Sequence, residues 1–295
     1  MCANKFSLAG KNALVICPEN NWGPEVVEGL KAAGCKVFLA GPNEEAMKAL
    51  CADGYYVYDH CTKGQALQMA AAAKEALGSV DVMVENSLYT DVKGWDQSYA
   101  TIYAQLERTH LGMMLTVQAV GDVMCEQGNG SVIIMTETGA LSGYDIYNYN
   151  QAPDQFDTDF SLVKGFIYGG AINYTRQAAG HLGENGCRCN CLVCAPKGGE
   201  EAFTAAYLRH SHLKTPVTGE NIADAVCFLA SDAAAYITGV SLPVDGGYTV
   251  RDIDGRYLTV SSNGAGVTDA ESVVTIARNG STWTISQNGA YLNDF

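Results

Sequence analysis

Four cysteines recur at short spacing in the second half of the chain, and thiolates at such spacing can bind a metal ion. They are Cys187, Cys189, Cys191 and Cys194. The apolar residues around them favour a β-strand, in which residues two apart share a face but lie ~6.6 Å apart along it. That spread is too large for one tetrahedral ion, whose thiolate ligands lie ~2.3 Å from its centre. The spacing therefore predicts no metal site.

Histidines and tyrosines form two further groups of polar side chains. His210 and His212 would fall on one side of an extended segment, but a metal ion there would still lack its third ligand. Residues 144–159, YDIYNYNQAPDQFDTD, combine several acidic residues with tyrosines that include Tyr147 and Tyr149. Their density favours a substrate lid over a solvated acidic loop.

Apolar strand-like runs alternate with helical patterns and would position these side chains. The expected strands are Asn12–Cys17, Lys36–Ala40, Tyr55–Tyr58, Val80–Val84, Ser131–Met135, Cys187–Val193 and Val240–Val244. The expected helices are Pro24–Ala33, Lys63–Leu77, Tyr99–Glu126, Ser161–Gly183 and Glu220–Leu229. Thr62 and Gln65 predict a capping box before the second of these helices. The alternation predicts an α/β fold with a doubly wound parallel sheet of about seven strands, whose ligands bind beyond the carboxyl ends of the strands.

The composition changes at about Arg251, which divides the chain into an expected domain of residues 1–250 and a β-rich extension of residues 251–295. In the extension, Asn279-Gly280 and Asn288-Gly289 separate β-rich runs and predict hairpin turns, so we expect a small β-meander. Large apolar residues alternate along these runs, and burying each is worth ~1.5–3 kcal/mol. We therefore expect the extension to dock across a subunit boundary of a homo-oligomer, either a dimer or a tetramer.

Composition excludes several classes of partner. The 295 residues carry 32 Asp+Glu against 18 Lys+Arg, a net charge of −14, which argues against binding nucleic acid or an anionic membrane. No apolar run approaches the ~18 residues of a membrane span, and the first residues lack the pattern of a secretion signal. The 11 cysteines are then expected to be reduced thiols. A soluble, cytoplasmic enzyme with a small-molecule substrate is the expected class.

Three segments resemble the short-chain dehydrogenase/reductase family. Residues 229–247, LASDAAAYITGVSLPVDGG, resemble its closing segment, and residues 77–84, LGSVDVMV, its fourth strand. Residues 186–198 are similar to its sixth strand and the loop that follows, which would bury the four cysteines in a central strand. The resemblance covers roughly residues 7–250 and implies a Rossmann-like fold. It also implies an NAD(P)-dependent oxidoreductase for a secondary alcohol or ketone on a hydrophobic molecule, with a steroid-like molecule as one option.

The cofactor motif of the family is degenerate here. The resemblance places the cofactor-binding positions at Cys17, Asn21, Trp22, Gly23, Gly41, Asp59, Asn86, Lys164, Pro196 and Gly198. In the phosphate loop only the last glycine, Gly23, is kept, and Glu25 falls in the first helical turn, where its carboxylate competes with a pyrophosphate. The loop is either remodelled for a dinucleotide or has lost it. Gly41 stands where an Asp would select NAD, and the absence of that acid weakly favours NADP as the cofactor.

The catalytic set departs further from the family. The resemblance places Thr109 at the Asn position, Glu137 or Thr136 at the Ser position, Phe160 at the Tyr position and Lys164 at the Lys position. Counting from Gly130-Ser131 selects Glu137, whereas counting from Gly139 selects Thr136. A phenyl ring cannot give or take a proton, so the ordinary hydride mechanism is interrupted at Phe160.

Three explanations of Phe160 stay open. Tyr147 or Tyr149 could deliver a phenol whose ionised form Lys164 would favour. Phe160 could be an engineered replacement. Alternatively, Glu137 and Lys164 could act as an acid/base pair in a cofactor-free lyase, dehydratase or isomerase, as halohydrin dehalogenases illustrate for this fold. A non-catalytic partner subunit is the remaining option.

Overall fold

The computed structural model describes residues 5–58, 62–143, 161–198 and 201–250, together with five short strands of the tail. The predicted site residues Asp59, Tyr147, Tyr149 and Phe160 lie outside the described residues.

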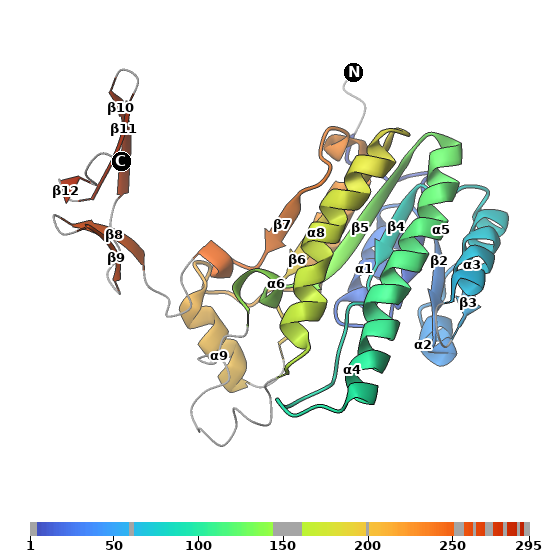
Figure 1. Ribbon diagram of the computed structural model, residues 1–295. Helices are drawn as coiled ribbons and strands as arrows, with labels where there is room; N and C mark the ends of the chain where they lie inside the picture. The colour runs from blue at the N-terminus through green and yellow to red at the C-terminus, as the bar shows by residue number, and fades with distance from the viewer. Residues whose placement is uncertain are drawn as a thin grey trace.

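Seven parallel strands form the central sheet in the order β3-β2-β1-β4-β5-β6-β7 (Figure 1). They are β1 (Asn12–Ile16), β2 (Lys36–Gly41), β3 (Gly54–Val57), β4 (Val82–Glu85), β5 (Gly130–Glu137), β6 (Cys187–Cys194) and β7 (Ser241–Val244). The predicted doubly wound α/β fold is confirmed. Because the strand order reverses between β1 and β4, their carboxyl ends flank the point where open sheets of this kind bind ligands.

Helices cover both faces of the sheet. The main ones are α1 (Gly23–Ala32), α3 (Lys63–Leu77), α4 (Tyr99–Leu106), α5 (Gly112–Gln127), α8 (Lys164–Gly183) and α10 (Gly219–Ala230). Shorter ones are α2 (Glu44–Ala49), α6 (Gly139–Ser142) and α9 (Glu201–His210). One face packs against α3, α5 and α8, and the other against α1 and α10 (Figure 1). In the described part of the chain, no helix is both long and apolar enough to cross a membrane.

The capping residues predicted the bounds of α3 correctly, whereas the apolar periodicity over a longer segment did not predict the break between α4 and α5. The helix spans Lys63–Leu77 as expected, with both hydrogen bonds of the Thr62–Gln65 capping box formed. The single helix expected over Tyr99–Glu126 is interrupted by a π-helical turn at Glu107–Leu111, which the apolar period does not reveal. Helices α2, α6 and α9 were not predicted, because two of them are too short to show a helical period.

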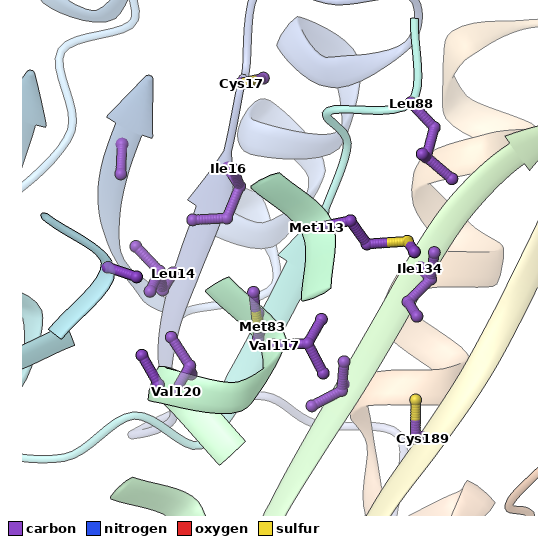
Figure 2. Close-up of a cluster of buried hydrophobic side chains, with 14 of the residues drawn as sticks. Leu14, Ile16, Cys17, Met83, Leu88, Met113, Val117, Val120, Ile134 and Cys189 are labelled. Atoms are coloured by element: carbon purple, nitrogen blue, oxygen red, sulfur yellow. The ribbon is translucent and has the colours of Figure 1, made fainter. Parts of the chain in front are cut away.

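The larger part of the core lies between the sheet and helices α3, α5 and α8. Figure 2 shows Leu14, Ile16 and Met83 of the strands facing Val117 and Val120 of the helix. The cysteines expected in a central strand are indeed buried in β6. Burial raises the pKa of the Cys189 and Cys191 thiols to about 12, so both stay protonated at neutral pH.

The turn between β1 and α1 combines two left-handed residues with one obligatory glycine. Cys17 has a φ of 49° and Asn21 a φ of 40°, a region that Asn tolerates and Cys rarely adopts. A Cβ at Gly23 would overlap with the carbonyl oxygen of Pro18 and lie 2.9 Å from Nδ2 of Asn86. The turn can therefore close only with glycine at position 23.

We expect Gly23→Ala to lower the free energy of unfolding by about 1–3 kcal/mol, because backbone must shift to admit the methyl group. Gly180→Ala is the matched control, since a Cβ at Gly180, near the C-terminal end of α8, would meet no atom of the described residues within 4 Å. This second change should stabilise the protein by up to ~1 kcal/mol through helix propensity. Urea denaturation of the three proteins measures both effects. Equal stabilities of Gly23→Ala and wild type would contradict the packing argument.

The tail forms two separate antiparallel units. Strands β8 (Tyr257–Ser261) and β9 (Gly264–Thr268) pair with each other, and β10 (Val274–Asn279), β11 (Thr282–Gln287) and β12 (Ala290–Tyr291) form a meander. Strands β8, β10, β11 and β12 overlap the β-rich runs expected at Arg256–Val260, Ser272–Arg278, Ser281–Gln287 and Ala290–Asp294. Strand β9 was not predicted, because its two glycines hide the alternation of a strand.

Docking of the tail across a subunit boundary stays a prediction. Truncation after Val250 should lower the oligomeric state or cause aggregation, because the alternating apolar residues would no longer cover a neighbouring surface. Light scattering and thermal melting of the truncated and full-length chains test this. A truncated chain with the same oligomeric state and the same melting temperature would show that the tail is an independent appendage.

Candidate active site

Lys164 and Glu137 form an ion pair at the carboxyl end of the sheet. Glu137 ends β5 and Lys164 begins α8, and Nζ of the lysine lies 3.6 Å from Oε2 of the glutamate. The Glu137 side chain is 12% exposed and that of Lys164 27% exposed. Nζ also lies 5.6 Å from the centre of the Tyr168 ring, one turn further along α8. The ammonium group is thus held between a carboxylate and an aromatic face, a favourable setting for a cation.

A cavity of about 360 Å³ surrounds this pair. Most of the residues that line it carry a polar or charged group. They are Asn21, Tyr89, Thr90, Asp91, Val92, Lys93, Glu137, Ser161, Lys164, Tyr168, Pro196, Lys197 and Phe203. Of the predicted site residues, Glu137, Lys164, Asn21 and Pro196 meet here. A substrate with several polar groups could find partners on most sides of this cavity.

The two threonines predicted as catalytic have structural partners instead. Thr136 is buried, and its hydroxyl donates to the carbonyl oxygen of Tyr168 at 3.1 Å, which ties β5 to α8. Thr109 is also buried, and its hydroxyl donates to the carbonyl oxygen of Gln105 at 2.7 Å inside the π-helical turn. Of the two candidates for the Ser position, Glu137 is therefore the one whose side chain lines the cavity with Lys164.

A larger cavity of about 560 Å³ lies beyond the carboxyl ends of β1, β2 and β4. It is lined by Cys17, Glu19, Asn20, Pro42, Asn43, Glu44, Glu45, Tyr58, Ser87, Tyr89, Asp91, Arg108 and Gly112. Tyr89 and Asp91 border both cavities, so the two share a wall. A ligand in the larger cavity could thus approach one held beside Lys164.

Several predicted cofactor-binding residues brace the loops around these cavities. Nδ2 of Asn86 donates to the carbonyl oxygens of Cys17, at 3.2 Å, and Asn20, at 2.8 Å. Nε1 of Trp22 donates to the carbonyl oxygen of Ala195 at 2.9 Å. These side chains fix the β1–α1 turn against β4 and β6, and so they would act on a nucleotide through the shape of the turn.

Two of the glycines predicted to bind the cofactor, Gly41 and Gly198, have close neighbours. A Cβ at Gly41 would lie 3.3 Å from Cα of Cys17, and one at Gly198 would lie 3.1 Å from Oγ1 of Thr204. Both positions therefore favour a residue without a side chain.

A lysine that the sequence analysis did not single out covers the start of α1. Nζ of Lys197 lies 2.6 Å from Oε1 of Glu25 and 2.9 Å from the carbonyl oxygen of Asn21, and 5.2 Å from the Trp22 ring. Glu25 lies in the first turn of α1, where backbone N–H groups attract anions. In the sequence, only the Glu25 carboxylate indicated this contact, because a half-buried acid is usually paired with a cation.

Glu85, at the end of β4, is a fully buried acid with a hydrogen-bond pattern that suits its neutral form. Oε1 accepts from the backbone N–H of Ser87 at 3.0 Å, and Oε2 contacts the hydroxyl of Thr116. That hydroxyl has one hydrogen and also lies 3.0 Å from the carbonyl oxygen of Met113. If Thr116 donates to Met113, Glu85 must donate to Thr116, which requires a protonated carboxyl group.

Burial raises the pKa of Glu85, and the hydrogen bond from the backbone N–H of Ser87 opposes this only in part. Since the folded pKa lies above the ordinary value of 4.5, the stability from the neutral acid is present at low pH. It is lost as pH rises through the folded pKa.

Glu85→Gln should remove this loss, because an amide keeps the acceptor for Ser87 and the donor for Thr116 without ionising. We expect the stability of the variant relative to wild type to increase as pH rises above the ordinary carboxyl value of 4.5. Denaturant unfolding at several pH values measures this difference. Glu126→Gln, at an exposed acid paired with Lys74, is the matched control and should show a constant offset. Parallel pH curves for Glu85→Gln and wild type would contradict a neutral Glu85.

Known proteins resemble the chain over most of its length. The sequence profile of a family described as Enoyl-(Acyl carrier protein) reductase matches residues 19–249. A short chain dehydrogenase/reductase of Aspergillus oryzae, astE, is 29% identical over 277 residues, which cover 83% of this chain and 97% of that protein. The galactitol 2-dehydrogenase (L-tagatose-forming) of Cereibacter sphaeroides is 29% identical over 268 residues, with coverage of 83% and 97%.

Solved structures agree on the fold. The crystal structure of a putative short-chain alcohol dehydrogenase from Sinorhizobium meliloti superposes with a TM-score of 0.69 at 23% identity, over 83% of this chain and 99% of that one. At this identity the likeness concerns the fold alone. The profile match extends over more than half of the chain, and it includes strands β2 to β7 and the residues that line the Lys164 cavity. The chain therefore belongs to the short-chain dehydrogenase/reductase superfamily of oxidoreductases.

Proposed function

We propose that the protein is an NAD(P)-dependent oxidoreductase that interconverts a hydroxyl and a carbonyl group on a small, polar molecule. The observation that carries the proposal is the Glu137–Lys164 pair, which lies in a cavity that shares a wall with a second, nucleotide-sized cavity. An acid/base pair beside a hydride carrier is what this reaction requires.

The lining of the smaller cavity favours a hydroxylated substrate over the hydrophobic, steroid-like molecule that the sequence led us to expect. Asp91, Lys93, Glu137, Lys164 and Lys197 all line it. An apolar ligand would bury these charged groups without offering them hydrogen bonds, which is unfavourable. The polyol in the name of the similar galactitol 2-dehydrogenase supports the same class of substrate.

The residues present fit the adenylate half of a dinucleotide. Two residues that line the larger cavity, Glu19 and Ser87, each have a buried side-chain oxygen without a hydrogen-bond partner in the described part of the chain, and a ligand rich in hydroxyl groups would satisfy them. The bound nucleotide would supply the hydride carrier. Lys197, beside the start of α1, provides the positive charge closest to the expected position of the pyrophosphate.

Glu137 and Lys164 can handle the proton that accompanies hydride transfer. In alcohol oxidation the proton of the substrate O–H group would pass to the Glu137 carboxylate, and a bound nicotinamide would supply the acceptor for the carbon-bound hydrogen and both of its electrons. The Lys164 ammonium stabilises the developing negative charge on the substrate oxygen through a hydrogen bond. Carbonyl reduction reverses these steps. A phenol from Tyr147 or Tyr149 is the alternative proton carrier.

A cofactor-free lyase, dehydratase or isomerase is the second candidate. The observation in its favour is the Glu25–Lys197 contact, which places a carboxylate in the first turn of α1, where a pyrophosphate would otherwise bind. Glu137 and Lys164 could move protons on a substrate without any hydride step. The two candidates differ in a direct observable, because only the oxidoreductase must bind a nicotinamide nucleotide.

We expect NADH or NADPH to bind the wild-type protein in calorimetric titration, and a panel of polyols to be oxidised with NAD⁺ or NADP⁺. Lys164→Met and Glu137→Gln should each lower kcat/KM by about 100-fold or more, the usual share of a general acid or base. Nucleotide affinity should stay close to that of wild type for Glu137→Gln, whose side chain lies outside the larger cavity.

Two controls separate catalysis from stability. Lys74→Met breaks an exposed ion pair with Glu126 and should leave kcat/KM unchanged. Thr136→Val should lower the free energy of unfolding by about 1 kcal/mol, because the carbonyl of Tyr168 loses its donor. Nucleotide-independent turnover without nucleotide binding would favour the second candidate. Full activity of Lys164→Met would exclude both.

A further inference from the structure

We propose that Glu19 is the residue that selects the nucleotide, because its carboxylate binds the two free hydroxyl groups of the adenosine ribose and so admits NAD(H) and rejects NADP(H). This inference rests on the nucleotide-dependent function proposed above. It concerns the residue that performs the selection, which the motif after β2 does not provide in this chain.

The carboxylate of Glu19 reaches the end of β2 from the neighbouring turn. Glu19 belongs to the turn between β1 and α1, yet its Oε2 lies 3.4 Å from the position that a Cβ at Gly41 would occupy. Gly41 is the last residue of β2, where an acid commonly recognises the ribose hydroxyls of NAD. The acid is therefore present at the required place but is contributed by a different segment of the chain.

Two unsatisfied polar atoms mark the same cavity. Oε2 of Glu19 is buried and has no hydrogen-bond partner among the residues that the structure describes. Within the same described residues Oγ of Ser87 also has no partner, and Ser87 as a whole is only 8% exposed. Both residues line the larger cavity. Buried groups of this kind are nearly always hydrogen-bonded, so the pair indicates a ligand that brings its own polar groups.

A vicinal diol matches this pair of groups. The carboxylate offers only acceptors, and the two ribose hydroxyls can donate to it. The Ser87 hydroxyl can donate or accept, and it can therefore complete the hydrogen bonds of a hydroxyl group that already donates to Glu19. Hydrogen bonds to an ionised carboxylate are about twice as strong as those between neutral groups.

The charges around the cavity oppose a 2′-phosphate. Among the described residues that line it, Glu19 and Asp91 are acidic and Arg108 is basic, whereas the acidic Glu44 and Glu45 at its border pair with Lys48. A phosphate with a charge of about −1.5 to −2 in place of the hydroxyl would meet the Glu19 carboxylate directly. Arg108 interacts favourably with Glu19 itself, so its charge is already partly balanced. The sequence favoured NADP because no acid follows β2, whereas in the structure Glu19 supplies an acid at that position.

The arrangement also makes a prediction for the protein without nucleotide. Burial raises the pKa of Glu19, and the charge of Arg108 opposes this only in part. The ionised carboxylate is thus held in the folded state at the expense of stability. A neutral, isosteric residue should fold at least as well, although it would bind the ribose less tightly.

The test compares wild type with Glu19→Gln in calorimetric titrations with NADH and NADPH. We expect wild type to bind NADH about tenfold or more tightly than NADPH, the scale of one charged hydrogen bond. Glu19→Gln should lose most of this preference, mainly through weaker NADH binding. Its melting temperature without nucleotide should equal or exceed that of wild type, which shows that the loss does not come from misfolding.

Glu45→Gln is the matched control. Glu45 borders the same cavity and carries the same charge, but it is exposed and pairs with Lys48 at 3.5 Å. Removing its charge should change the NADH to NADPH ratio by less than about twofold, because exposed charges are well screened. A similar change in both variants would reduce the effect to general electrostatics and overturn the assignment of Glu19.

Two other outcomes would also decide the matter. Tighter binding of NADPH than of NADH, or an unchanged ratio in Glu19→Gln, would reject Glu19 as the selecting residue while the proposed oxidoreductase function remains. Binding of neither nucleotide to wild type would reject that function and this inference together.

Discussion

The ligand-binding edge of this protein depends on the side-chain amide of Asn86. By donating to the carbonyl oxygens of Cys17 and Asn20, it holds the β1–α1 turn against the end of β4. The close approach of Gly23 to Pro18 completes the same junction. As a result, Glu19 on one side and Ser87 on the other face a common cavity. The hydrogen bond from Trp22 to the carbonyl oxygen of Ala195 attaches the same turn to the end of β6.

Three carboxylates near the carboxyl ends of the strands lie in different surroundings. Glu85 is buried among hydrogen bonds that suit a neutral acid. Glu137 faces a lysine and lines a cavity. Glu19 lies beside a glycine at the end of β2, with one oxygen that has no partner among the described residues. The same functional group is thus surrounded by hydrogen bonds in one place, by a cation in the second and by a cavity in the third.

Much of the fold could be predicted from sequence because its signals are local. The apolar strands and the Thr62–Gln65 capping box depend on residues close together in the chain. The site was harder to predict. Whether Thr136 or Glu137 faces the cavity depends on a one-residue register at a strand end, and two ways of counting gave different answers. The contacts of Lys197 with Glu25 and of Glu19 with the end of β2 join distant segments, and no local pattern encodes them.

The outer border of the sheet has a consequence for assembly. Strand β7 is the last in the order, and Val240 and Val244 accept hydrogen bonds from β6 through their carbonyl oxygens. Since backbone groups alternate along a strand, those of Pro243 point the other way, towards the open edge. Proline has no N–H to offer there, so an eighth strand could not pair fully with β7. Pro243 thus hinders strand addition at this edge of the described sheet, which protects the edge against aggregation.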